Sequence, residues 1–253
     1  MIPNPIQKVL LTLSTHDVRC LLMGGQACVL YGAAEFSRDC DIAILCDEPN
    51  LVRLQSALNE LKAEAIAVPP LEAAHLERGH AVHFRCHAVG TEGVRIDVMA
   101  KLRGLDPFDE LWLRRTTIEV DAGTRIEVLA LPDLVAAKKT QRDKYWPMLR
   151  RLVEAHSAKH ATSATQEQLR FWLLESRTPQ MLLELAVREP TLANELTAQR
   201  PLLQHAIQND LNALRSALAD EESREREADR IYWEPLKREL EAMRHAQRGT
   251  RPN

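Results

Sequence analysis

The sequence contains no apolar run near the roughly 20 residues that a membrane-spanning helix needs. It also has little net charge, because 33 Lys and Arg residues are balanced by 36 Asp and Glu residues. A broad, non-specific nucleic-acid surface requires a strong basic excess, so this balance argues against one while leaving room for a local basic groove. With 45% hydrophobic and 27% charged residues, the composition is typical of a soluble globular protein rather than a disordered or fibrous one.

Cysteine is scarce, and the five cysteines include no C-x-x-C pair. An odd number without that spacing is typical of reduced thiols in a cytoplasmic protein rather than of a disulfide framework. The first residues, MIPNPIQKVLLTL, are too polar and too lightly charged for a secretory signal. We therefore expect a cytoplasmic protein with no membrane partner.

Glycine nearly disappears in the second half of the chain. Seven of the nine glycines precede residue 105, and the chain after residue 130 is rich in Leu, Ala, Glu, Arg and Gln. Glycine at turns and β-branched residues in strands are typical of sheet domains, whereas the composition after residue 130 favours helices. We therefore predict an α/β (α+β) domain with a mixed sheet over residues 1–130, followed by an all-helical domain over residues 131–253.

One stretch, GGQACVLYGAAEFSRDCDIAIL, combines two signals of phosphate chemistry. Gly24 and Gly25 end a predicted strand and precede a predicted helix, where backbone amides can approach an anion closely. Asp39 and Asp41 lie two apart on the next predicted strand, so both side chains leave the same face. Such a carboxylate pair is a hard-oxygen site suited to Mg²⁺. Alone, the glycine pair is more simply a turn and the aspartate pair more simply part of a solvent-facing strand, but together they predict a phosphate-and-metal site.

A third carboxylate, Asp97, lies in the predicted strand 94–99, on the face opposite Val94, Ile96 and Val98. A lone acid in an apolar strand is costly unless it has a partner or a cation. If this strand lies beside the one that carries Asp39, three carboxylates meet. Three carboxylates can hold two divalent ions, the arrangement used for in-line phosphoryl or nucleotidyl transfer.

The strand 80–88 is predicted to form a hairpin with 94–99 through a five-residue loop. This loop would place Arg85 opposite Asp97, where it could bind a triphosphate or orient the carboxylate. The alternative is an ordinary cross-strand ion pair on an exposed face. A zinc site also stays open by composition, although alternation separates its candidate ligands onto two faces: His83 and His87 on one, His80 and Cys86 on the other.

Basic residues follow Pro132, which is expected to open a long helix at its first turn. Lys138 and Arg142 are four apart and would share a face of that helix. They could contact a triphosphate or an RNA phosphate, although a solvated helix face is the simpler interpretation. Five further prolines divide the rest into five or six predicted helices.

These motifs resemble the polymerase-beta-like nucleotidyltransferase superfamily and, within it, the AbiEii-like group of toxin-type bacterial enzymes. The resemblance covers residues 19–145, about half the chain, and is carried by Gly24, Gly25, Ala27, Asp39, Asp41, Asp97, Lys138 and Arg142. It implies a Mg²⁺-dependent enzyme that transfers a nucleoside monophosphate from an NTP to a hydroxyl acceptor.

The resemblance also implies roles for residues and partners. Asp39, Asp41 and Asp97 would be catalytic and would hold two Mg²⁺ ions. Nucleotide binding would fall to Gly24, Gly25, Lys138 and Arg142, with Arg85 as an addition from the hairpin. A tRNA is the leading acceptor, and an antitoxin protein is the expected partner of a toxin-like enzyme. A small molecule or a protein side chain stays open as the acceptor.

The chain departs from the group just before Asp39. Where the group carries Arg-x-Thr, this sequence reads Glu35-Phe36-Ser37. The departure favours an alternative, namely a catalytically degenerate nucleotidyltransferase fold that binds nucleotides or a protein partner. A further alternative is an interaction protein whose helical half carries the function.

Overall fold

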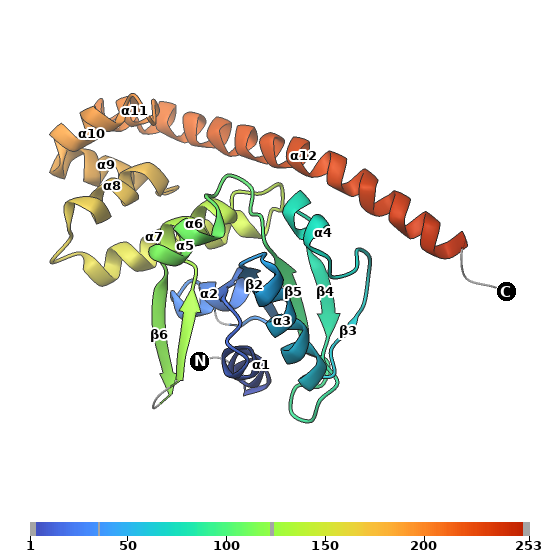
Figure 1. Cartoon of the computed structure of the whole chain (residues 1–253). Helices are drawn as coiled ribbons and strands as arrows, with labels where there is room; N and C mark the ends of the chain where they lie inside the picture. The colour runs from blue at the N-terminus through green and yellow to red at the C-terminus, as the bar shows by residue number, and fades with distance from the viewer. Residues whose placement is uncertain (1–3, 35, 122–123, 250–253) are drawn as a thin grey trace. The chain divides into compact units, whose positions relative to one another are not determined.

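The computed structural model describes residues 4–34, 36–121 and 124–249, and in these residues seven strands form one sheet (Figure 1). Across the sheet the strands are ordered β3-β4-β5-β2-β1-β7-β6. The strands are β1 (Cys20–Met23), β2 (Asp39–Ile44), β3 (Glu64–Ala65), β4 (Val82–Arg85), β5 (Arg95–Met99), β6 (Thr116–Asp121) and β7 (Thr124–Val128).

The sheet is mixed. Strand β2 pairs with β5 in parallel, and β1 pairs with β7 in parallel, whereas the other neighbours are antiparallel. Strands β4 and β5 form the predicted hairpin, and β6 and β7 form a second one whose connecting residues 122–123 lie outside the described residues. The predicted fold class, a mixed-sheet α/β domain with a helical part, is confirmed.

Twelve helices lie in the described residues. They are α1 (Asn4–Thr15), α2 (Gly24–Leu30), α3 (Glu48–Glu60), α4 (Ala73–Arg78), α5 (Phe108–Leu113), α6 (Leu131–Ala137), α7 (Tyr145–His160), α8 (Gln166–Glu175), α9 (Pro179–Arg188), α10 (Pro190–Leu196), α11 (Leu203–Ile207) and α12 (Leu211–Gly249). None of the helices in this described part of the chain has the length and hydrophobicity needed to span a bilayer.

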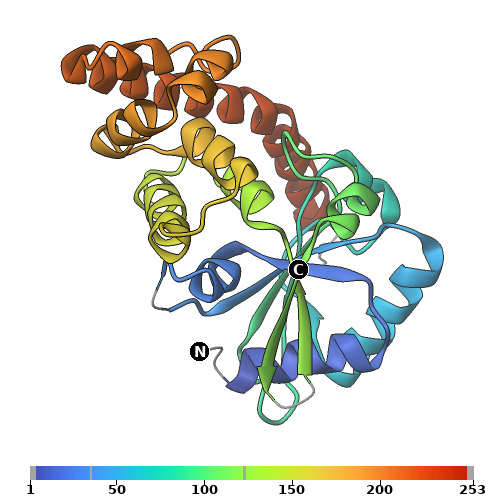
Figure 2. The same cartoon turned by 90° about the vertical axis from the view of Figure 1, so that its left-hand side faces the viewer.

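The core of the sheet unit follows from residue spacing. In β2 the side chains alternate, so that Cys40 and Ile42 are fully buried while Asp39 and Asp41 are half-buried. Helix α1 contacts both β2 and α3 (Figure 2), and its buried apolar residues recur at helical spacing: Ile6, Val9, Leu10 and Leu13. All five cysteines are free thiols, as expected from their spacing.

The chain divides into two compact units. The sheet unit contains residues 1–30, 34–137 and 231–253, and the helical unit contains residues 31–33 and 138–230. The boundary predicted from composition lay after residue 130. Residues 131–137 instead belong to the sheet unit. The part of α12 from Ile231 onward belongs to the sheet unit as well.

Two predictions about prolines are wrong. Pro132 begins no long helix, because α6 ends at Ala137. Pro235 separates no helices, because α12 continues through it to Gly249. A proline removes one backbone donor and usually kinks or ends a helix. In α12 the 39-residue length leaves many hydrogen bonds on either side of that single lost donor.

Candidate functional site

The acidic face of the sheet is built by two parallel strands. The register of β2 and β5 pairs Asp41 with Asp97 and Asp39 with Arg95. Neighbouring strands lie about 4.8 Å apart, and side chains at paired positions leave the same face. Asp39, Asp41 and Asp97 are therefore on one half-buried face. Below them, Cys40 and Ile96 point into the core with no exposed surface.

The two glycines lie directly against Asp41. Gly24 has φ +68°, and a Cβ there would lie 1.8 Å from Asp41 Oδ2. The next residue, Gly25, donates its backbone N–H to the same oxygen over 3.3 Å. A Cβ at Gly25 would also lie 2.4 Å from Ser37 Oγ. In the structure, the glycine turn thus makes room for the Asp41 carboxylate. The predicted cradling of phosphates by Gly24 and Gly25 stays a prediction.

Asp97 is held by two neighbours on the same face. Arg95 Nε donates to Asp97 Oδ1 over 2.6 Å, and His83 Nδ1 lies 2.8 Å from the same oxygen. Burial raises the pKa of Asp97, but hydrogen bonds from His83 and Arg95 outweigh burial and hold the pKa below its usual value. The hydrogen bond to Asp97 also raises the pKa of Arg95. Asp97 is therefore ionised at neutral pH.

The predicted register of the β4–β5 hairpin is wrong by two residues. His83 pairs with Asp97, and Arg85 pairs with Arg95 on an exposed part of the strand. The loop is longer than predicted because it contains two successive turns, in which Thr91 N donates to Ala88 O and Val94 N donates to Thr91 O. A shift by two residues keeps every side chain on its predicted face. Arg85 consequently loses the position that supported its role in nucleotide binding.

The fit of this face to divalent ions is partial. Asp39 and Asp41 offer the hard oxygen atoms that Mg²⁺ prefers. The described residues contain no group of three or more His, Cys, Asp or Glu side chains arranged to hold a metal. In addition, Asp97 Oδ1 already accepts a hydrogen bond from Arg95. The described residues of the stretch 80–87 likewise form no cluster that could hold zinc. The two Mg²⁺ ions stay a prediction.

Lys138 and Arg142 do not share a helix, which corrects the prediction. Both lie in the connection between α6 and α7, within the helical unit. In this connection the backbone N–H groups form hydrogen bonds that do not belong to a helix. Thr140 N donates to Lys138 O, and Gln141 N donates to Asp229 Oδ2. These bonds replace the continuation of α6.

Lys138 and Arg142 meet instead on one aromatic ring. Lys138 Nζ lies 4.3 Å from the centroid of the Tyr145 ring, and the Arg142 guanidinium carbon lies 5.7 Å from it. Lys138 is buried, so its charge is stabilised by the ring face rather than by water. The roles of both residues in nucleotide binding stay predictions.

Sequence reasoning missed His83 and Arg95 as partners of Asp97. Their signal was present, because strand alternation already places all three on the polar face. A loop two residues longer would have put His83 opposite Asp97. Within the Glu35-Phe36-Ser37 stretch, Ser37 has a structural contact, because Gln26 Nε2 donates to Ser37 O over 2.7 Å. Glu35 lies outside the described residues.

Comparison with known proteins yields distant structural similarities. No protein-family model matches the chain, and no curated protein matches its sequence. One similar solved structure is described as a "putative nucleotidyltransferase from H. pylori", with 13% identity, a TM-score of 0.42 and coverage of 89% of this chain and 94% of that one. Another is JHP933 from Helicobacter pylori, with 13% identity, a TM-score of 0.38 and coverage of 96% and 95%.

Proposed function

We propose that this chain is a nucleotidyltransferase that moves a nucleoside monophosphate from an NTP to a hydroxyl group. The observation that supports this most directly is the pairing of Asp41 with Asp97, with Asp39 on the same face. The Gly24-Gly25 turn packs on Asp41 at that face. These are the positions on which the sequence resembles the polymerase-beta-like superfamily.

In the proposed reaction, the acceptor oxygen attacks the α-phosphorus of the NTP. The bond between the α-phosphorus and the bridging oxygen breaks, so that the β,γ-pyrophosphate leaves, and the acceptor hydroxyl gives its proton to solvent water. Asp39 and Asp41 would hold Mg²⁺, which when bound offsets triphosphate charge and polarises phosphoryl oxygens. A carboxylate with a lowered pKa is a weak base, so Asp97 is assigned to steering the acceptor hydroxyl by a hydrogen bond. Arg95 and His83 would keep Asp97 ionised and oriented for this task.

The proposed acceptor is a tRNA, and the proposed setting is a toxin-like enzyme with an antitoxin partner. The support for both is the sequence resemblance to the AbiEii-like group. The test incubates the full chain with each radiolabelled NTP, Mg²⁺ and total tRNA, followed by gel separation. Label appearing on the tRNA supports the proposal. Label transferred to a small hydroxyl compound or to protein, with none on tRNA, refutes the tRNA acceptor and keeps the reaction type.

The matched variants are Asp41→Asn and Asp109→Asn. Asp41→Asn retains an oxygen that can accept the Gly25 N–H while removing the charge, so transfer should fall by roughly 10²-fold or more, as it does when one preorganised electrostatic group is lost. Asp109 is an exposed acid on α5, and its variant should transfer at the wild-type rate. Equal rates in both variants would refute the proposed role of the acidic face.

A second candidate is a nucleotide-binding protein that does not turn over its ligand. The observation that favours it is the engagement of Asp97 Oδ1 by Arg95 and His83, together with the missing Arg-x-Thr before Asp39. Calorimetry distinguishes the two functions. NTP binding that Asp41→Asn abolishes, with no transfer to any acceptor, would favour the second candidate.

A further inference from the structure

The helical unit contains a cavity of about 450 Å³ that the sheet site does not use. It lies where α7, α9 and α12 come together. Its polar lining is dominated by guanidinium groups, since it includes four arginines and two carboxylates: Arg150, Arg177, Arg215, Arg226, Asp143 and Glu222. Its lining residues all belong to the helical unit.

The two lining carboxylates are already engaged by one arginine. Arg226 forms ion pairs with both Asp143 and Glu222. Among the described residues, Arg150 and Arg215 have no hydrogen-bond or ion-pair partner, and both side chains are exposed. The lining therefore carries excess positive charge that the protein itself leaves uncompensated.

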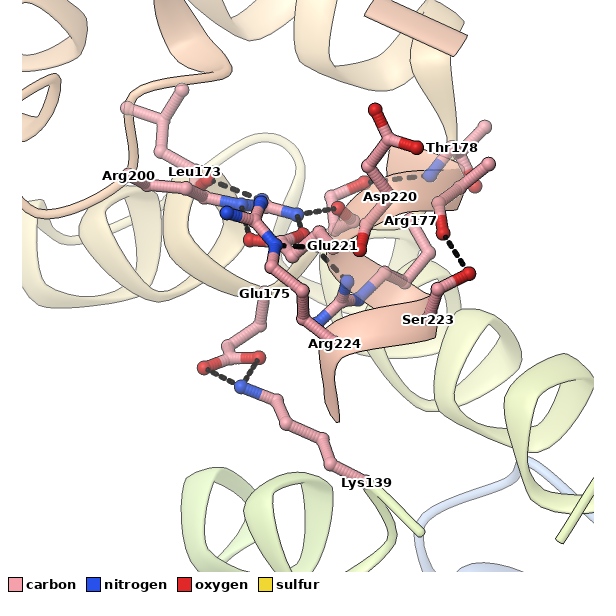
Figure 3. A network of polar contacts seen from close by, with 12 residues as sticks. Lys139, Leu173, Glu175, Arg177, Thr178, Arg200, Asp220, Glu221, Ser223 and Arg224 are labelled. Atoms are coloured by element: carbon pink, nitrogen blue, oxygen red, sulfur yellow. Dashed lines mark hydrogen bonds and ion pairs between the residues drawn. The ribbon is translucent and has the colours of Figure 1, made fainter. Parts of the chain in front are cut away.

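Beneath the lining, two buried arginines share one carboxylate. Arg177 Nη1 lies 2.5 Å from Glu221 Oε2, and Arg200 Nη2 lies 2.8 Å from the same oxygen (Figure 3). Arg200 also donates to the carbonyl oxygens of Leu173 and Ser176. The nearby Glu175 is paired with Lys139. Glu221 is thus the carboxylate that both buried guanidinium groups contact.

Arg177 connects the buried cluster to the cavity. Its side chain is 7% exposed, and its Nε is buried without a hydrogen-bond partner among the described residues. Burial lowers the pKa of Arg177, and the acids Glu221, Glu175 and Glu225 offset that only in part. A buried donor without an acceptor is costly. An anion in the cavity would supply an acceptor and a counter-charge.

The remaining walls are apolar and include an indole. Trp146 is buried, and the guanidinium carbons of Arg177 and Arg226 lie 5.2 and 5.4 Å from its ring centroid. Pro147 and Pro179, in the first turns of α7 and α9, also line the cavity. The first turn of a helix carries positive potential, which adds to that of the arginines.

We propose that this cavity binds a small phosphate ester of nucleotide size. Guanidinium groups match phosphate oxygens in a two-point fork, and the excess positive charge of the lining favours an anion. The volume lies within the roughly 300–1,000 Å³ of small-ligand sites, which combine apolar walls with a few polar groups. The apolar walls favour a nucleoside phosphate over bare phosphate. This site is independent of the proposed transfer reaction on the sheet.

The test measures AMP binding to the full chain by calorimetry and by tryptophan fluorescence, without divalent ions. Because AMP could also bind at the sheet, the titrations are repeated with Asp41→Asn, which should leave cavity binding unchanged. Arg150→Ala and Arg215→Ala should each weaken binding about tenfold or more, the loss expected for one charged hydrogen bond. Arg151→Ala is the matched control, because Arg151 is exposed beside Arg150 and does not line the cavity.

Adenosine, inorganic phosphate and a short single-stranded RNA separate the ligand classes. AMP should bind more tightly than phosphate, adenosine should not bind, and Trp146→Phe should remove the fluorescence change while calorimetric binding persists. Equal AMP affinity in the wild type and both arginine variants would overturn the proposal, as would the absence of AMP binding. RNA binding without AMP binding would overturn the small-molecule assignment.

Discussion

His83 Nδ1 lies 2.8 Å from Asp97 Oδ1, and Arg95 Nη2 lies 3.1 Å from the same His83 nitrogen. The nitrogen cannot donate to Asp97 and accept from Arg95 at once, so its protonation selects one of the two hydrogen bonds. Arg95 Nε holds Asp97 in either case. The three side chains therefore form one unit in which Arg95 is the constant partner of the carboxylate.

Replacing Arg95 with Met should destabilise the fold. The change removes the guanidinium from the half-buried Asp97 carboxylate and leaves only His83 as its partner. We expect the free energy of unfolding to fall by about 1–2 kcal/mol, since Arg95 is partly exposed to screening water. Arg85→Met is the control, because Arg85 is the exposed residue opposite Arg95, and it should change stability by under about 0.5 kcal/mol. Urea denaturation of both variants checks this, and equal losses would contradict it.

Gly24→Ala should be more harmful than a typical glycine replacement. Gly24 and Gly104 have φ values of +68° and +71°, and the added Cβ at Gly104 meets nothing within 4 Å. Gly104→Ala therefore reports the backbone strain alone, about 1–2 kcal/mol. At Gly24 the Cβ also meets Asp41 Oδ2 at 1.8 Å, and we expect a further loss of about 1–3 kcal/mol. Melting curves of both variants decide the matter, and the same Tm in both would argue against close packing on Asp41.

Glu221→Gln should destabilise the helical unit strongly. The change removes the charge of the carboxylate that the buried Arg177 and Arg200 both contact, which costs about 3 kcal/mol or more. The adjacent variant Glu222→Gln breaks only a partly exposed pair with Arg226 and should cost under about 1 kcal/mol. Chemical denaturation measures the difference. Stability that is equal in the two variants would mean that the buried arginines are neutralised in another way.

His156 should make stability depend on pH. Burial, followed by the positive charges of His160 and Lys159, lowers the pKa of His156 below 6.5 in the folded chain, and its Nδ1 lies 2.9 Å from Trp172 Nε1, which donates to it. The unfolded chain therefore binds the proton more readily. The stabilisation is complete above about pH 6.5 and is lost as the pH falls from there through the folded pKa.

The matched variants for this pH effect are His156→Gln and His245→Gln. Glutamine at position 156 can still accept from Trp172 but has no proton to gain in this range. In the wild type the free energy of unfolding should fall by at most about 1.4 kcal/mol per pH unit as the pH decreases below about 6.5, and the variant should lack this fall. The exposed His245 should have no effect when replaced. Urea titrations at several pH values test this, and a wild-type slope in His156→Gln would exclude His156 as the cause.

Strand periodicity was sufficient to predict which residues share the acidic face. Asp39, Asp41 and Asp97 could be placed there because side chains alternate along a strand, a property of each local segment. That the strands of Asp39 and Asp97 lie side by side was only a condition of the prediction, and the structure meets it by pairing β2 with β5 in parallel. Composition likewise predicted a sheet part and a helical part, since glycine and leucine usage differ between the two halves.

Register and helix ends depended on contacts between distant residues. His83 rather than Arg85 faces Asp97 because two turns between Ala88 and Val94 lengthen the loop, and spacing in sequence does not reveal how a loop closes. Lys138 and Arg142 leave the helix because Gln141 bonds to Asp229, which lies 88 residues further along the chain. The arginine-lined cavity also depends on contacts between distant residues, since its lining comes from three helices and from the segments that precede two of them. Local sequence determines which face of a strand or helix a side chain lies on. Which distant residue it contacts follows only from tertiary packing, because each buried polar group must find a hydrogen-bond acceptor or donor there.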